Sequence, residues 1–240
     1  MRILLTSDWH ADKSTLGVDR FDEIRRAAFQ TVDAAITEDV DLFAFLGDLS
    51  DPTDALRALR ALELAIECER RLTLSGVKSI WIAGNHDVGE AGDGRTTISP
   101  MRALVRDDWP WVAESPGVRQ IADGGSMVAV MALPYSAAST PYCMRGFVEE
   151  AIGPDAIQRG IVLGHATYIP GAVEGEETIE MPRGRAVPFP IDLVPPGWTM
   201  ANGHFHTPQV TPGGVIIPGA LARLTRGERS NDPRFVIVEI

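Results

Sequence analysis

Cysteine is almost absent from this sequence, with only Cys68 and Cys143 among its 240 residues. The two lie far apart and form no Cys-x-x-Cys pair. The sequence therefore indicates neither a disulfide framework nor a thiolate metal site. We expect both cysteines to be reduced, buried thiols.

Long apolar runs are missing as well. The apolar stretch near the N-terminus is too short for a signal peptide, and no stretch is long enough to span a bilayer. We therefore expect a cytoplasmic protein that does not enter a membrane. Hydrophobic residues still make up 45% of the chain, which is enough for the core of one domain covering residues 1–240.

Basic charge is also scarce, since 22 lysines and arginines face 33 acidic residues and leave a net charge of -11. Proteins that bind nucleic acid through charge alone need a basic surface. The balance therefore disfavours passive binding of nucleic acid. It remains compatible with an enzyme that meets phosphate groups through bound cations, because such ions are the largest local charges in their site.

The first part of the chain alternates between apolar runs and amphipathic segments. Strands are predicted at residues 2–6, 41–46 and 77–83, and helices at residues 19–38 and 51–74. Asp51 followed by Pro52 is typical of a helix start, with an acidic N-cap and proline at the first helical position. Strand and helix in alternation predict an α/β fold with parallel strands.

The second part of the chain predicts short strands separated by glycine-rich turns. They are expected at residues 111–114, 118–121, 127–133, 161–163, 198–201, 209–210, 215–217 and 235–239. Two further helices are predicted at residues 99–106 and 141–152, and residues 167–190 are predicted to form a long loop.

Polar clusters follow five of these apolar segments, and together they contain all five histidines of the chain. The clusters are Asp8-Trp9-His10, Gly47-Asp48, Gly84-Asn85-His86-Asp87, Gly164-His165 and Gly203-His204-Phe205-His206. The carboxyl ends of neighbouring parallel strands meet at one edge of a sheet, so these side chains are expected to converge there. A single histidine or Gly-Asp pair is commonly structural, but five such clusters favour a site.

Residue spacing within the clusters predicts how the side chains point. Asp8 and His10 are two residues apart, so an extended chain would turn both to one side and Trp9 to the other. His204 and His206 have the same spacing around Phe205. The glycines allow the sharp turns that bring such groups close together.

The candidate ligands suit two metal ions. They are two carboxylates, four imidazoles and one amide, namely Asp8, Asp48, His10, His165, His204, His206 and Asn85. This is too many for one tetrahedral zinc and fits two ions that share a carboxylate. Donors without thiolate suit manganese, iron or zinc. His86 is left over and is placed to protonate a leaving oxygen or to stabilise charge on a phosphoryl group, with Asp87 to orient it.

The ordered set Asp-x-His, Gly-Asp, Gly-Asn-His-Asp, Gly-His and Gly-His-x-His resembles the calcineurin-like metallophosphoesterases over almost the whole chain. The resemblance implies a four-layer sandwich in which helices cover two mixed sheets. It also implies that Asp48 bridges two ions and that His86 is catalytic. One ion would be held by Asp8, His10, Asp48 and His206, and the other by Asp48, Asn85, His165 and His204.

The opening and closing segments resemble a narrower group, the SbcD-type DNA repair exonucleases. The similar segments are residues 1–10, 203–209, 218–228 and 235–239. This resemblance implies a manganese-dependent exonuclease or endonuclease acting on DNA, an SMC-like coiled-coil ATPase as partner, and a homodimer as a further option. Arg223, Arg226 and Arg229 are then either a solvated face or a ridge that grips phosphates.

Two other functions stay open at this point. One is a phosphodiesterase or phosphatase for small nucleotides, for which an acidic surface would matter less. The other is a scaffold that binds proteins without metal. Scaffolds of this kind lose metal ligands, whereas this sequence retains all seven candidates.

Overall fold

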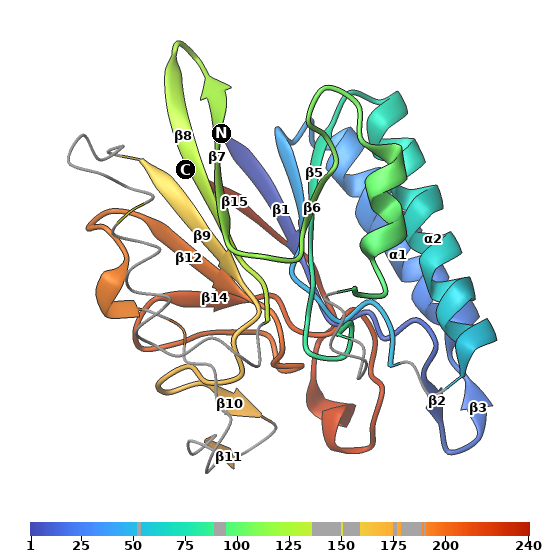
Figure 1. The fold of residues 1–240 in the computed structure, drawn as a ribbon. Coiled ribbons are helices and arrows are strands. Elements are labelled where there is room, and N and C mark those ends of the chain that lie inside the picture. The colour runs from blue at the N-terminus through green and yellow to red at the C-terminus, as the bar shows by residue number, and fades with distance from the viewer. Residues whose placement is uncertain are drawn as a thin grey trace.

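Two mixed β-sheets pack face to face at the centre of this computed structural model, which describes residues 1–51, 54–88, 95–135, 150, 159–174, 177–178, 189 and 191–240. Helices α1 (Phe21–Thr37) and α2 (Ala55–Leu74) cover the outer face of one sheet (Figure 1). The arrangement is the sandwich of mixed sheets and helices that the family resemblance implies.

The sheet under the helices has the strand order β15-β1-β4-β5-β6. Its strands are β1 (Arg2–Thr6), β4 (Leu42–Phe45), β5 (Lys78–Ile82), β6 (Trp111–Ala113) and β15 (Val236–Glu239). Strands β1, β4, β5 and β6 are parallel, and β15 alone runs antiparallel to its neighbour β1. The predicted alternation of strand and helix is therefore confirmed for the first part of the chain.

The second sheet has the order β13-β14-β12-β9-β8-β7. Its strands are β7 (Gly117–Asp123), β8 (Ser126–Leu133), β9 (Gly160–Gly164), β12 (Thr199–Asn202), β13 (Gln209–Val210) and β14 (Val215–Ile217). The four central strands are parallel, and the two edge strands β7 and β13 are antiparallel to their neighbours.

Side chains alternate between the faces of each strand and build separate cores on the two faces. In β1, Leu4 packs under the helices with Phe43 and Trp81, whereas Ile3 and Leu5 face the second sheet. Burial of one such side chain contributes about 1.5–3 kcal/mol. A third core, with Trp198 and Phe205, covers the outer face of the second sheet.

Short elements complete the described chain. Two small hairpins pair β2 (Ser14–Thr15) with β3 (Val18–Asp19) and β10 (Val173–Glu174) with β11 (Glu177–Thr178). Three 3-10 helices are η1 (Ser99–Leu104), η2 (Ile191–Leu193) and η3 (Gly227–Ser230). The hairpin β10–β11 occupies part of the predicted long loop, and most of the predicted helix at residues 141–152 lies outside the described residues.

The predicted start of the second helix is wrong. Helix α2 begins at Ala55, and its N-cap is Asp54, whose side chain accepts hydrogen bonds from the backbone N–H groups of Leu56 and Arg57. The two carboxylate oxygens of Asp51 instead contact Lys13 and His86, and Asp54 caps the helix in its place. Cys68 is buried on α2 as expected, whereas Cys143 lies outside the described residues. In the described part of the chain, every helix is too short or too polar to span a bilayer.

Glu69 is a buried carboxylate that ties α2 to β5. It accepts hydrogen bonds from the hydroxyls of Thr73 and Ser79 and from Nε1 of Trp81. We expect Glu69→Ala to lower the free energy of unfolding by about 1–3 kcal/mol, because it leaves the buried donors of Ser79 and Trp81 without their acceptor. Urea unfolding would measure this, with exposed Glu63→Ala on the same helix as the control. Equal unfolding midpoints for the two variants would contradict the assigned role.

Candidate metal centre

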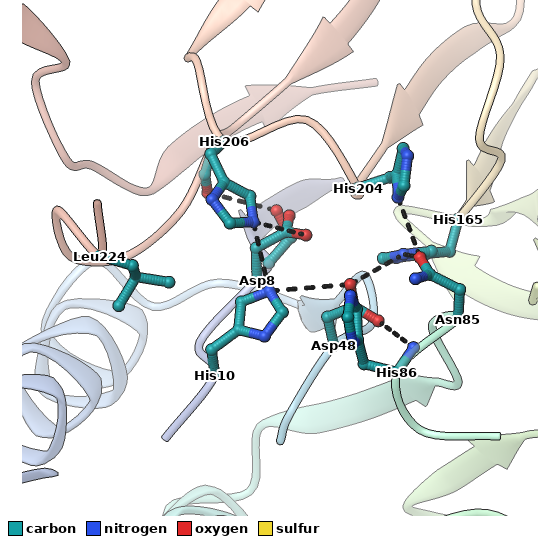
Figure 2. A network of polar contacts seen from close by, with 12 residues as sticks. Asp8, His10, Asp48, Asn85, His86, His165, His204, His206 and Leu224 are labelled. Carbon is teal, nitrogen blue, oxygen red and sulfur yellow. Dashed lines mark hydrogen bonds and ion pairs between the residues drawn. The ribbon is translucent and has the colours of Figure 1, made fainter. Parts of the chain in front are cut away.

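The carboxyl ends of strands from both sheets meet at one edge of the sandwich. Asp8 follows β1, Asp48 follows β4, Asn85 follows β5, His165 follows β9 and His204 follows β12. Chain segments that are far apart in the sequence thereby deliver polar side chains to one place, as the strand pattern predicts (Figure 2).

Asp8, His10 and His206 form a first cluster at this edge. Their ligand atoms all lie within 4.8 Å of one another. The Nε2 atoms of His10 and His206 are 3.2 Å apart, and His206 Nε2 lies 4.0 Å from Asp8 Oδ1. We refer to these three residues as the Asp8 cluster.

Asp48, His165 and His204 form a second cluster with the same compactness. Asn85 joins it, because its Oδ1 lies 3.0 Å from His165 Nε2 and 2.9 Å from His204 Nδ1. Asp48 Oδ2 is 3.4 Å from His165 Nε2 and 3.7 Å from His10 Nε2. Asp48 therefore faces both clusters, and the structure brings all seven candidate ligands together (Figure 2).

The backbone at the first motif is not extended, so the predicted geometry of Asp8 and His10 is wrong. Their φ angles are 52° and 41°, in the left-handed region, where a non-glycine residue costs about 1–3 kcal/mol. Backbone hydrogen bonds to the neighbouring loop fix this conformation: Asp8 N–H donates to Gly47 O at 2.9 Å and His10 N–H to Asp48 O at 3.1 Å. Trp9 still points into the core, against Phe45 and Trp81.

Two of the motif glycines are required by close approach between loops. A Cβ atom on Gly84 would lie 2.1 Å from Asp48 Oδ1, and one on Gly203 would lie 2.2 Å from the carbonyl oxygen of Leu46. Real Cβ contacts are essentially never so short, so only glycine lets these strand ends approach Asp48 and Leu46 this closely.

Partners behind the imidazoles orient two of them. His165 Nδ1 lies 2.6 Å from the carbonyl oxygen of Leu46, and His206 Nδ1 lies 2.9 Å from Glu228 Oε1. Each partner accepts a hydrogen bond from the Nδ1–H group, so Nε2 is the nitrogen that faces the cluster. Metal-binding histidines commonly have such partners. Buried Asn202 also holds the backbone beside these loops, through Ala166 and Gly203.

The donors of the Asp8 cluster fit a divalent cation. Both carboxylate oxygens of Asp8 are buried and have no hydrogen-bond partner among the described residues. Burial raises the pKa of Asp8 to about 6 and lowers the pKa of His10 to about 3. A buried carboxylate and facing imidazole lone pairs are costly without a partner, and a cation would satisfy all of them at once.

The second cluster combines a carboxylate with two histidines whose pKa values are shifted in opposite directions. Burial alone would raise the pKa of Asp48, but the nearby His165 and His10 outweigh it and hold that pKa below its usual range. Burial likewise opposes protonation of His165, but the charge of Asp48 raises its pKa to about 9. Burial lowers the pKa of His204 to about 3. A cation at this cluster competes with the proton on His165, as at other imidazole sites.

His86 lies beside both clusters and remains 40% exposed. Its backbone N–H donates to Asp48 Oδ1 at 2.9 Å, and its Nδ1 lies 2.7 Å from Asp51 Oδ1. The other oxygen of Asp51 pairs with Lys13, and the Asp51 N–H donates to Asp12 Oδ1 at 2.6 Å. Asp51 therefore orients the one histidine that neither cluster uses.

The predicted orienting role of Asp87 is not what the described contacts show. Its buried carboxylate accepts hydrogen bonds from the backbone N–H groups of Asp48 (2.9 Å), Leu49 (3.1 Å) and Gly84 (2.8 Å), and from Thr97 Oγ1 at 2.5 Å. Burial, together with the charge of Asp48, raises the pKa of Asp87 to about 6. Asp87 thus fixes the loops that carry the candidate ligands, whereas Asp51 contacts the His86 imidazole.

Sequence reasoning missed Asp51, Glu228 and Asn202 as residues of this site. The position of Asp51, three residues after Asp48, indicates that it could lie near the site, but the proline that follows it favours a helix cap. Glu228 lies 22 residues from its partner His206, so no local pattern connects them.

The fold and the paired ligand clusters define a class, the metallophosphoesterases. The chain belongs to the calcineurin-like phosphoesterase family, whose sequence profile matches residues 1–208.

Among curated proteins, the chain is similar to SbcD, a component of the SbcCD nuclease of Escherichia coli K12, with 24% identity over 242 residues. That match covers 89% of this chain and 58% of the relative, so the chain spans little more than half the relative's length.

Solved structures of low sequence identity share the fold. A dimetal phosphatase from Danio rerio has a TM-score of 0.56 at 12% identity, covering 99% of this chain and 91% of its own. GAP50, described as the anchor in the inner membrane complex of Plasmodium, has a TM-score of 0.57 at 12% identity, covering 99% and 80%. An enzyme and an anchor on one fold mean that function must be argued from the site.

Proposed function

We propose that this protein is a dinuclear metal-dependent phosphodiesterase that cleaves DNA, a nuclease of the SbcD type. The observation that carries the proposal is the pair of adjacent ligand clusters. Asp48 belongs to the second cluster, and its Oδ2 also lies 3.7 Å from His10 of the first, with His86 alongside. Seven retained ligands argue against a metal-free scaffold.

In this proposal, the first ion is held by Asp8, His10, Asp48 and His206, and the second by Asp48, Asn85, His165 and His204. When bound, two such ions activate a water molecule and neutralise charge on a phosphoryl group. Imidazole, carboxylate and amide donors without a thiolate suit manganese, and iron and zinc fit the same donors.

The protein's own contribution is orientation and proton transfer. Asp51 holds the His86 ring through Nδ1, which leaves Nε2 for a leaving oxygen or a phosphoryl oxygen. Asp87 holds the backbone of Asp48 and Gly84, and so keeps the bridging carboxylate in place. The exposed edge of the His86 ring marks the side from which a substrate enters.

DNA is the proposed substrate because two features support it. One is the similarity to a nuclease component over 89% of the chain. The other is a loop, residues 221–231, that presents Arg223, Arg226 and Arg229 to solvent beside His206. We call it the arginine loop. A coiled-coil ATPase partner, a homodimer, a single domain and a cytoplasmic location belong to the same proposal.

A second candidate function is hydrolysis of small nucleotides. The net charge of -11 favours it, because such substrates need no extended basic surface. Both functions use the same two ions and the same His86, so the substrate decides between them.

The salt dependence of DNA binding distinguishes the two functions. Each neutralised phosphate contributes about 0.9 to the slope of log affinity against log salt on duplex DNA. Two or three arginine contacts therefore predict a slope of roughly 2 to 3 in magnitude. Arg223→Ala with Arg226→Ala should flatten that slope and have a much smaller effect on hydrolysis of bis-p-nitrophenyl phosphate, a small effect being expected because Arg223 also hydrogen-bonds the Asn231 backbone.

The measurement is a salt titration of duplex binding, with calcium in place of manganese if calcium suppresses cleavage. Arg25→Ala with Arg26→Ala is the matched control, because it removes two exposed charges from α1, on the outer face of the first sheet. An absence of duplex binding at low salt, together with efficient hydrolysis of small nucleotides, would move the proposal to the second function.

A further inference from the structure

The arginine loop holds His206 at two points. Glu228 lies 2.9 Å from the imidazole Nδ1 through its Oε1, and Asn231 donates from Nδ2 to the His206 carbonyl oxygen at 3.1 Å. Both residues are 8% exposed, although their neighbours in the loop are open to solvent. One ligand of the Asp8 cluster is therefore fixed, in side chain and in backbone, by a single loop.

The same buried residues fix the conformation of the loop itself. Glu228 Oε2 accepts from the Leu224 N–H at 2.7 Å, and Glu228 Oε1 accepts from Thr225 Oγ1 at 3.0 Å. The backbone oxygen of Asn231 accepts from Arg223 Nε at 2.7 Å. Asn231 thus links Arg223 directly to His206, and Glu228 links the loop at Leu224 and Thr225, the residues between Arg223 and Arg226, to the same histidine.

We propose that Glu228 is the positioning residue for His206, and that through it the arginine loop couples the binding of a phosphate chain to the binding of a cation at the Asp8 cluster. An anionic chain on Arg223 and Arg226 stabilises the loop conformation in which Glu228 meets His206. That contact keeps the proton on Nδ1 and the Nε2 lone pair toward the cation. Coupling of two equilibria is reciprocal, so the cation also tightens binding of the chain.

The positioning role is tested first without DNA. Glu228→Gln keeps the size of the side chain but removes its charge, so manganese binding to one of the two sites should weaken about 10- to 100-fold and the other site should be unchanged. Equilibrium dialysis against manganese with elemental analysis measures this. Asp232→Asn, an exposed acidic residue just beyond the loop, is the matched control and should bind both ions as the wild type does.

A double variant shows whether Glu228 acts through His206. His206→Ala alone should lose the same ion, and adding Glu228→Gln should cause no further loss, because the two residues work as one unit. Wild-type affinity at both sites in Glu228→Gln, or a defect that adds to that of His206→Ala, would overturn the inference.

The coupling is tested with a phosphorothioate duplex that resists cleavage. The duplex should tighten manganese binding to the affected site of the wild type and of Asp232→Asn, but not of Glu228→Gln. Equal tightening in Glu228→Gln would overturn the coupling. This part rests on the proposed function: a wild type that binds no duplex would refute DNA as the substrate, whereas the dialysis result without DNA would still decide the role of Glu228.

Discussion

Asp48→Ala is expected to abolish tight binding of both metal ions. Asp48 Oδ2 lies within 3.7 Å of imidazole nitrogens from the two clusters, so its removal takes a ligand from each site at once. It also leaves His165 and His10 facing each other across the gap without the negative charge that stabilises either a cation or a proton there. Elemental analysis after dialysis against manganese measures the number of ions retained.

Asp8→Ala is the matched control for this experiment. Asp8 contributes a carboxylate to one cluster only, so its removal should cost one ion and spare the second. Circular dichroism should show that both variants are folded. Two ions retained per chain by Asp48→Ala would refute the shared carboxylate.

His86→Ala is expected to separate chemistry from metal binding. The His86 imidazole contacts Asp51 and lies outside both ligand clusters, so the variant should retain two ions. Its turnover should fall by on the order of 10²–10⁴-fold, which is the usual contribution of a positioned acid. The measurement compares kcat on DNA with kcat on bis-p-nitrophenyl phosphate, with metal content determined on the same samples.

The two substrates show which task His86 performs. A p-nitrophenolate leaves without a proton, so an acid role predicts a larger loss on DNA than on the small diester. Stabilisation of charge on the phosphoryl group predicts equal losses. Unchanged turnover on both substrates would show that His86 has no part in the reaction.

The strand pattern made much of this site predictable. Apolar runs that end at Gly47, Gly84 and Gly203 identified the edge of the sheets where ligands gather, because only glycine permits the close approaches seen there. The same argument selected the seven candidate ligands that the structure brings together, and the surplus His86. Periodicity sufficed because strands and helices bury faces of regular spacing.

Contacts between distant loops could not be predicted in this way. The left-handed conformations of Asp8 and His10 depend on backbone hydrogen bonds to the loop after β4, which the local sequence does not encode. The local sequence around Asp51 predicts a helix cap. Its actual partners, Lys13 and His86, follow two other strands, so only the tertiary structure brings them to Asp51. The contact between Glu228 and His206 likewise depends on the tertiary structure and has no local sequence pattern.

The central claim is that two ions share the Asp48 carboxylate. A crystal grown with manganese and measured at the manganese absorption edge tests it directly. The account predicts two anomalous peaks about 3.5–4 Å apart, as in other two-metal sites, one on each side of Asp48. A single peak, or two peaks of which either lies out of reach of Asp48, would contradict it.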